Sequence, residues 1–326
     1  MSEKLKRKNS SFSSIIERGL DAVVRQTNSI LTVGTFDGVH LGHRKIIEDL
    51  VQRSKDVSGV TILVTFDPHP REILLQQSLP RLTTIEERAA ILSSLGLDRM
   101  VVLPFTEQFS KLSAKSFVTE LLVGSIGFRT IVVGHDHRFG KNRTGNVDLL
   151  IALGKQYNFD VGVISPHIVG GSAVSSRRVR SLLQEKGDVA LAAQLLGRSY
   201  SLTGRVIRGA SRGKKLGYPT ANLRLLDPSK VIPSYGVYAV NVQLQGILKG
   251  GMMNIGVRPA IKDSEGVHLE VHLFDFDKTI YGQELTVYFL ERIRGERDFD
   301  SMEKLSDAMR KDEIDCRQIL RASSLK

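Results

Sequence analysis

The stretch Thr32-Val33-Gly34-Thr35-Phe36-Asp37-Gly38-Val39-His40-Leu41-Gly42-His43 decides the fold of the first half of the chain. It starts as an apolar run, which predicts a buried strand, and continues as a glycine-rich turn. An amphipathic helix is then expected to open at Arg44. His40 and His43 stand at the mouth of that helix, where unpaired N–H groups and the helix dipole favour an anion. The stretch therefore predicts a nucleotide-handling site; the alternative is a strand–turn–helix whose histidines only cap the helix.

Outward from this stretch, apolar runs alternate with helical patterns between about residues 29 and 186. Strands are expected over 60–66, 100–104, 130–133 and 161–164, and helices over 84–95, 114–123, 146–155 and 176–184. Such alternation predicts a doubly wound parallel α/β sheet, which binds ligands at the carboxyl ends of its strands. The turns over 34–43, 134–140 and 165–176 lie at such ends, so we expect them to share a site.

The pattern of apolar runs in the sequence changes after about Leu195. Short runs are separated by Gly, Pro, Asp and Ser, a spacing typical of an antiparallel β unit and here of a barrel. The runs cover 202–208, 236–244, 250–255, 269–276 and 285–291, and a helical pattern follows over 301–325. We therefore expect two domains, an α/β domain over 1–186 and a β-barrel domain with a C-terminal helix over 187–326.

The composition limits the class of protein. The chain has 326 residues, which favours two domains, and no apolar run long enough to span a bilayer. No secretory signal is recognisable at its start. A single cysteine, Cys316, excludes an intramolecular disulfide and fits a reducing cytosol, so a cytoplasmic location is expected. The net charge of +11 suits polyanions. Since no nucleic-acid-binding pattern is present, we expect small-molecule partners rather than nucleic acid or a membrane; the oligomeric state stays open.

Several strings in the chain resemble one enzyme family. The string G-T-F-D-G-V-H-L-G-H contains the H-x-G-H signature of nucleotidyltransferases and is similar to bacterial FAD synthetases, the bifunctional riboflavin kinase/FMN adenylyltransferases. The resemblance extends from about residue 30 to about 301. The further matching strings are F-D-P-H-P over 66–70, G-H-D-H-R-F-G over 134–140, S-S-R-R-V-R over 175–180 and G-K-K-L-G-Y-P-T-A-N over 213–222.

For the first domain, the resemblance implies a nucleotidyltransferase that joins FMN to ATP and releases pyrophosphate. It implies catalytic roles for His40, His43 and Arg180. Phosphate or ATP contacts are implied for Gly34, Phe36, Gly38, Ser175 and Ser176, and flavin contacts for Asp136, His137, Arg138 and Phe139. Two departures from the family pattern stand out, because His137 replaces a usual Phe and Arg177 replaces a usual Thr.

For the second domain, the resemblance implies a riboflavin kinase. Gly213, Lys214 and Gly217 would contact ATP phosphates, Thr220 and Asn222 would hold Mg²⁺, and Arg294 would contact flavin. Residues 268–273 alternate with period two, so His268, Glu270 and His272 are expected on one strand face. Glu270 matches the carboxylate that serves as base toward the ribityl 5′-hydroxyl. Ala260 stands where the family usually has Thr.

The cofactor implied by the resemblance is Mg²⁺, with ATP, riboflavin, FMN and FAD as substrates or products. Two alternatives remain at this point. One is another nucleotidyltransferase with an unrelated β domain, against which the 213–222 string and Glu270 argue. The other is a non-catalytic flavin-binding regulator, which predicts the loss of His43 or Glu270; both residues are present.

Overall fold

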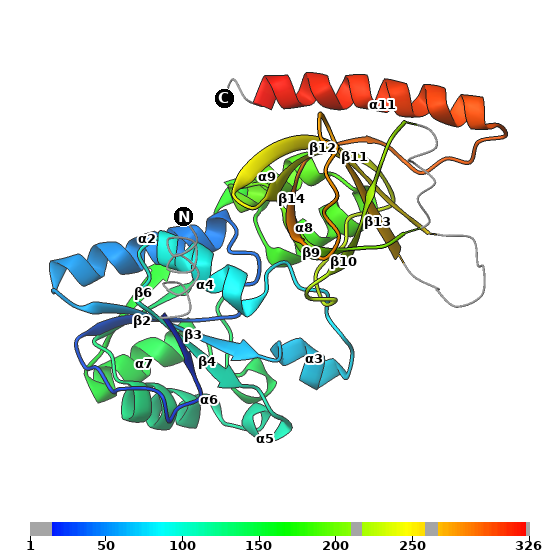
Figure 1. Ribbon diagram of the computed structural model, residues 1–326. Helices are drawn as coiled ribbons and strands as arrows, with labels where there is room; N and C mark the ends of the chain where they lie inside the picture. Colours follow the sequence, from blue (N-terminus) through cyan, green and yellow to red (C-terminus); the bar gives the residue numbers. More distant parts are fainter. Residues whose placement is uncertain (1–14, 210–216, 258–266, 324–326) are drawn as a thin grey trace. The chain divides into compact units, whose positions relative to one another are not determined.

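The computed structural model describes residues 15–209, 217–257 and 267–323 (Figure 1). The chain forms two compact units, Met1–Ser176 and Arg177–Lys326. The first is an α/β sheet unit and the second contains a closed antiparallel barrel followed by a helix, which confirms the predicted fold class. Gly213, Lys214 and Ala260 lie outside the described residues.

The first unit contains a parallel sheet of six strands in the order β1-β4-β3-β2-β5-β6. The strands are β1 (Ile16–Arg18), β2 (Ser29–Val33), β3 (Val60–Asp67), β4 (Arg99–Pro104), β5 (Thr130–Gly134) and β6 (Asp160–Ile164). The edge strand β1 is too short for its sequence to have predicted it. From β2, the order runs one way through β3 and β4 and the other way through β5 and β6. The carboxyl ends of β2 and β5 therefore flank the point at which a doubly wound sheet binds its ligand.

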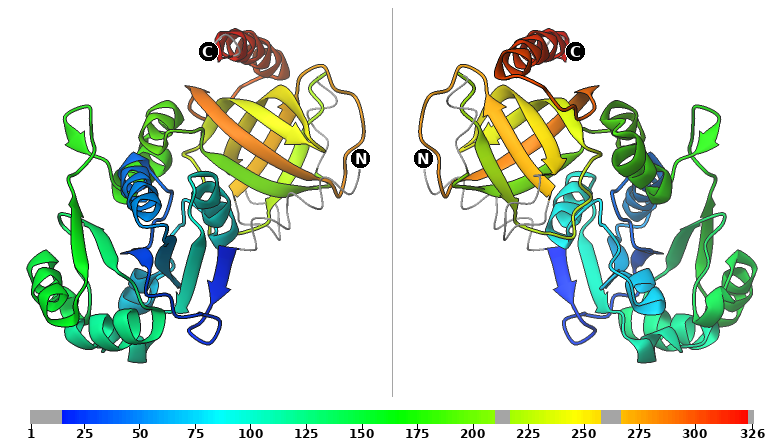
Figure 2. Two further views of the ribbon diagram at one scale, coloured as in Figure 1. Left: turned by 90° about the vertical axis from the view of Figure 1, so that its left-hand side faces the viewer. Right: turned by 90° about the vertical axis from the view of Figure 1, so that its right-hand side faces the viewer.

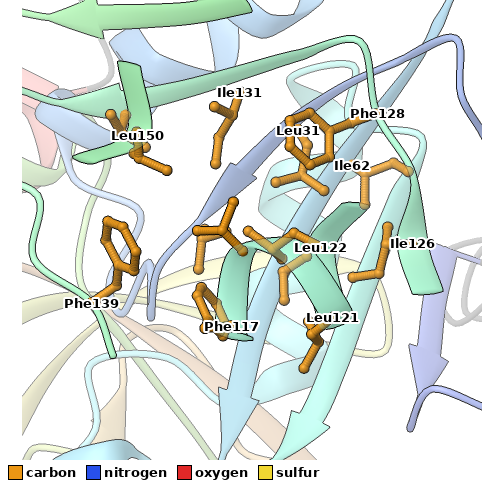
Figure 3. Close-up of a cluster of buried hydrophobic side chains, with 14 of the residues drawn as sticks. Leu31, Ile62, Phe117, Leu121, Leu122, Ile126, Phe128, Ile131, Phe139 and Leu150 are labelled. Atoms are coloured by element: carbon orange, nitrogen blue, oxygen red, sulfur yellow. The ribbon is translucent and has the colours of Figure 1, made fainter. Parts of the chain in front are cut away.

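Helices cover both faces of this sheet, because alternate residues of each buried strand point to opposite faces. Leu31 and Ile131 face a core completed by Phe117, Leu122 and Leu150, which Figure 3 shows as one cluster. On the other face, strand residues pack on Ile47 and Leu50 of α2 (Leu41–Asp56) and on Ala89 and Leu92 of α4 (Ile85–Ser94).

The helix after the opening stretch begins at Leu41, so the expected start at Arg44 is wrong. The reason is local, because His40 in extended conformation caps the helix and its Nδ1 accepts a hydrogen bond from the His43 N–H. The capping box between Thr84 and Glu87 opens α4 as predicted. The expected helix over 114–123 is a short α6 (Ala114–Ser116) followed by a π-helix over Phe117–Ile126.

Smaller elements complete the first unit and its border. They are α3 (Pro70–Leu75), α5 (Glu107–Ser110), the 3₁₀ turn Lys141–Arg143, α7 (Val147–Tyr157), and the hairpin of β7 (Ile168–Val169) and β8 (Ser172–Ala173). Helix α8 (Ser176–Ser181) starts at the border between the units and continues as the π-helix Leu182–Lys186. Helix α9 (Val189–Leu196) then leads into the barrel.

The barrel closes with the strand order β10-β13-β12-β11-β14-β9 (Figure 2). Its strands are β9 (Ser201–Ile207), β10 (Ala221–Leu225), β11 (Gly236–Leu244), β12 (Ile247–Val257), β13 (Val267–Leu273) and β14 (Glu284–Arg294). The period-two pattern on β13 is confirmed, since Leu269, Val271 and Leu273 are buried and the residues between them are partly exposed. Strand β10 was not predicted. Helix α11 (Met302–Ser323) lies on the outside of the barrel, against β11, β12 and β14.

Candidate functional site

The loop after β2 has a strained backbone. Phe36 and Val39 adopt positive φ angles of 48° and 40°, and Gly38 lies at 82°. A positive φ costs a non-glycine residue about 1–3 kcal/mol, so it persists only where surrounding contacts impose it. Such backbone strain is typical of functional sites. Here it occurs in the residues that immediately precede the start of α2.

Asp37 supplies the contacts that hold this loop. Its buried carboxylate accepts hydrogen bonds from the N–H groups of Leu82 and Thr83 at 3.0–3.1 Å and from the Thr83 hydroxyl at 3.1 Å. Arg88 of α4 lies 3.6 Å from the same carboxylate, and both side chains are almost fully buried. The Asp37–Arg88 pair therefore fixes the loop from beneath, and Asp37 is a structural carboxylate.

Arg88→Met is expected to destabilise the first unit by about 3–5 kcal/mol, because it leaves the Asp37 carboxylate buried without its cation. The measurement is urea unfolding of the full chain followed by circular dichroism. Arg18→Ala is the matched control, since Arg18 pairs with Glu86 of the same helix α4 but at an exposed position. That pair is worth at most about 1 kcal/mol. Equal losses in the two variants would contradict the role given to Arg88.

His40 and His43 stack on each other at the start of α2. Their ring centroids lie 3.6 Å apart at an interplanar angle of 15°, and Phe36 stacks on His43 at 4.5 Å. Nδ1 of His43 is buried without a hydrogen-bond partner among the described residues. Burial, reinforced by His40 and Arg88, holds the pKa of His43 well below its usual range. The His43 imidazole is therefore neutral at pH 7. The two rings form a rigid pair, because they stack on each other and His40 also caps the helix.

Ser175 and Ser176 are positioned at the end of the first unit. The hydroxyl of Ser176 donates a hydrogen bond of 2.9 Å to the backbone carbonyl of Asp37, which ties the start of α8 to the histidine loop. Ser175, the preceding residue, is exposed. Arg180 lies one helical turn after Ser176 in α8 and belongs to the second compact unit. The structure thus brings Gly34, Phe36, Gly38, His40, His43 and Ser176 together.

The loop after β5 carries the residues implied for flavin. Asp136 and Arg138 are exposed, whereas Phe139 is buried and belongs to the core cluster of Figure 3. His137 stacks on Phe139 at 5.7 Å. Burial lowers the pKa of His137 from 6.5 to about 4, so this side chain is a neutral flat ring at pH 7. Since the unfolded chain binds this proton more readily, His137 weakens the fold as the pH falls from 6.5 towards about 4.

The turn at 66–70 has a structural explanation. The side chain of His69 caps α3 by accepting a hydrogen bond of 3.1 Å from the Arg71 N–H, and Glu72 completes a capping box. Arg81 pairs with Glu72 and with Asp67 at 2.9 Å each. The cap and these ion pairs therefore hold residues 66–70 as a rigid turn.

In the second unit, barrel closure brings the predicted kinase residues together. Asn222 of β10 lies opposite Glu270 of β13 in the antiparallel register. Thr220, just before β10, has its hydroxyl 3.5 Å from Glu270 Oε2. Asn222 is 8% exposed, and a Cβ at Gly209 would come within 2.1 Å of its amide nitrogen, so a larger residue at 209 would displace the Asn222 side chain. The Thr220 hydroxyl and the Glu270 carboxylate thus meet although 50 positions separate them in the sequence, and Asn222 lies on the strand paired with that of Glu270.

These oxygens fit a hard divalent cation. Mg²⁺ usually takes one or two protein oxygens together with substrate phosphates, rather than a closed set of acidic residues. The Thr220 hydroxyl and the Asn222 amide oxygen are donors of this kind, which leaves the Glu270 carboxylate for the proposed role as base. Among the described residues, no three His, Cys, Asp or Glu side chains gather as a metal-binding group.

Two further predicted residues have different surroundings. Gly217 is exposed with a φ of 82°, a conformation that favours glycine. Arg294 donates to both oxygens of Asp312 in α11, at 2.8–3.1 Å, so its guanidinium is engaged in attaching that helix to the barrel. Arg88 and Asp312 were both missed by the sequence analysis. Each is a charged residue at an apolar-face position of its helix, and that pattern could have identified them.

Comparisons with known proteins agree with this geometry. A family model described as FAD synthetase matches residues 23–178, and one described as riboflavin kinase matches residues 196–320. A bifunctional riboflavin kinase/FMN adenylyltransferase of Buchnera aphidicola subsp. Schizaphis graminum is 40% identical, over 88% of this chain and 92% of the relative. The protein of the same name from Escherichia coli K12 is 35% identical, over 90% and 93%.

One solved structure has the same fold along nearly the whole chain. It is described as a macrolide-efflux protein from Streptococcus pneumoniae, with a TM-score of 0.84 and 30% identity over 93% of this chain and 99% of that one. In the part of the present chain that the structure describes, no helix has the length and apolar content needed to cross a membrane.

Proposed function

Since the chain belongs to the family of bifunctional riboflavin kinase/FMN adenylyltransferases, it is an enzyme of FAD biosynthesis, and we propose which of its residues carry each reaction. The part matched by FAD synthetase adenylylates FMN, and the part matched by riboflavin kinase makes FMN. We place the boundary between the two domains after residue 186, where the helical segment that starts as α8 ends.

In the adenylylation step, the phosphate of FMN attacks the α-phosphorus of ATP and pyrophosphate leaves, without a covalent enzyme intermediate. The observation that supports this assignment most is the stacking of His40 on His43 at the start of α2. A donor fixed before the reaction stabilises charge that builds up on the α-phosphate without reorganising. Arg180, with its planar fork of donors, grips the phosphates. Gly34, Phe36, Gly38, Ser175 and Ser176 surround the ATP, while Asp136, His137, Arg138 and Phe139 serve the flavin.

In the kinase step, the ribityl 5′-hydroxyl of riboflavin attacks the γ-phosphorus of another ATP, the bond from this phosphorus to the β–γ bridging oxygen breaks, and ADP leaves. Glu270 orients this hydroxyl and accepts its proton, which its place beside Thr220 supports. Thr220 and Asn222 would hold Mg²⁺, which when bound neutralises charge on the phosphates. Gly213, Lys214 and Gly217 contact the ATP phosphates, and Arg294 contacts the flavin side. Placement and electrostatics thus account for most of the catalysis.

The same proposal covers partners and location. ATP, riboflavin and FMN are the partners that these sites require, rather than nucleic acid or a membrane. We propose a cytoplasmic location because the chain has a single cysteine, Cys316, which excludes an intramolecular disulfide and fits a reducing compartment.

Arg180→Lys tests the contact with the ATP phosphates. The variant keeps the charge but loses the guanidinium fork, so FMN adenylylation is expected to fall at least about tenfold in kcat/KM for ATP. Arg177→Lys, at an exposed position of the same helix, is the matched control and should retain parent kinetics. Parent-like kinetics in Arg180→Lys would mean that a point charge suffices there or that Arg177 or Arg178 carries the contact.

The overall activity is tested by incubating the purified protein with riboflavin and Mg·ATP and separating the flavins over time. FMN should appear first and FAD second, with pyrophosphate released in step with FAD. Unchanged riboflavin would contradict the kinase assignment, and FMN that is never converted to FAD would contradict the adenylylation assignment.

A further inference from the structure

The segment Tyr218–Thr220 (residues 218–220) is attached to strand β13 at two points. Nδ1 of His272 lies 2.8 Å from the carbonyl oxygen of Pro219, and the next residue, Thr220, has its hydroxyl 3.5 Å from Glu270. A carbonyl oxygen only accepts hydrogen bonds, so the His272 Nδ1 carries the proton and donates it. The ring of Tyr218 packs edge-on against His272 at a centroid distance of 5.3 Å.

The His272–Pro219 and Glu270–Thr220 contacts are neighbours because of the geometry of β13. Glu270 and His272 are two residues apart on a strand, so their side chains point to the same face about 6.6–6.8 Å from each other along the chain. The residues between and beside them are buried in the barrel, which fixes the direction of both side chains. Because Pro219 and Thr220 are adjacent, one short segment makes both contacts with the same face of β13.

Helix α11 also contacts this segment, through Tyr218. The Tyr218 hydroxyl interacts with the carboxylate of Glu313, and burial together with Glu313 raises the Tyr218 pKa, so the hydroxyl remains a donor at neutral pH. Glu313 in turn accepts a hydrogen bond of 2.8 Å from Arg317, which pairs with Asp275 just after β13 at 2.9–3.0 Å. Strand β13 and helix α11 thus both contact the Tyr218–Thr220 segment.

We propose that His272 is a positioning residue for riboflavin phosphorylation, because its hydrogen bond to the Pro219 carbonyl holds the Thr220 hydroxyl beside Glu270. This inference rests on the proposed kinase roles of Thr220 and Glu270. His272 itself touches neither substrate nor metal in this scheme. Its effect is to keep the proposed base and the proposed phosphate-side ligand in one arrangement, and displacing such groups by about 1 Å typically costs up to about 100-fold in rate.

Two substitutions in the full chain separate the hydrogen bond from the ring. His272→Phe keeps a flat ring but removes the donor, and kcat for FMN formation is expected to fall about 10- to 100-fold. His272→Asn loses the ring, but its amide can donate to the Pro219 carbonyl from nearly the place of Nδ1. This variant is expected to keep most of the parent kcat. Rescue by Asn is a result that a merely space-filling role would not produce.

The controls come from the same chain. The rate of FMN adenylylation, which is assigned to residues before 187, should be unchanged in both variants, and a parent-like melting transition shows that the barrel is folded. His268→Phe changes the histidine on the other side of Glu270 on the same strand face, and it should leave kcat near the parent value.

Each outcome decides one point. A parent-like kcat in His272→Phe, an Asn variant as slow as the Phe variant, or an equal loss in His268→Phe would overturn the positioning role. If the parent protein itself makes no FMN from riboflavin, the proposed kinase function fails instead, so the two failures are distinguishable.

Discussion

His43→Ala is expected to make FMN from riboflavin at the parent rate while FAD formation falls about 10²–10³-fold. The reason is that His43 belongs to the first unit and is held rigidly by stacking on His40 and Phe36. Losing one prearranged donor to a developing charge on phosphorus removes stabilisation that water does not restore. The measurement is the initial rate of each step, with riboflavin and ATP for the first and with FMN and ATP for the second.

Lys45→Ala is the matched control for this experiment, since Lys45 is exposed on the same helix α2. It should leave both rates unchanged. A His43→Ala protein that makes FAD at the parent rate would show that His43 only fixes the helix start, which is the alternative that the sequence left open.

Glu270→Gln is expected to show the opposite pattern. The amide has nearly the shape of the carboxylate and can still contact the Thr220 hydroxyl, so the barrel should fold, yet it cannot accept the ribityl proton. Riboflavin phosphorylation should fall about 10²–10⁴-fold. FMN adenylylation should be retained, which a coupled assay with FMN and ATP measures directly.

Glu284→Gln serves as control for the charge change, because Glu284 is an exposed barrel residue paired with Arg205 at the surface. It should leave both activities intact. Loss of adenylylation in Glu270→Gln, or full kinase activity in that variant, would contradict the separation of the two reactions.

Much of the fold could be predicted because its elements follow from local patterns. Alternating apolar runs predict the parallel sheet and the barrel, and the capping box at Thr84 predicts the start of α4. The start of α2 at Leu41 was missed because the cap is a histidine, a residue outside the usual capping set. Strand β10 was missed because Asn222 interrupts its apolar residues and its first three residues are all buried, so neither an apolar run nor a period-two alternation is visible.

The site was predicted in part for the same reason. Short strings along the chain identify His40, His43 and Glu270, but the contacts that hold them join distant residues. From the sequence alone, Arg88 would be interpreted as a solvent-exposed charge, although it follows Ile85 and precedes Leu92 on the buried face of α4. The resemblance implies that Arg294 contacts flavin. Its ion pair with Asp312 could not be predicted, because that pair depends on the packing of α11 against the barrel. Barrel register alone brings Thr220 to Glu270.

The central claim is that two different phosphorus atoms of ATP are transferred, one by each part of the chain. The direct measurement supplies riboflavin with ATP labelled either at the γ- or at the α-phosphorus and follows the label in each flavin. The γ-label should enter FMN and remain in FAD, and the α-label should enter FAD only and never FMN. Label from the α-position in FMN, or FAD that carries none of it, would contradict the account.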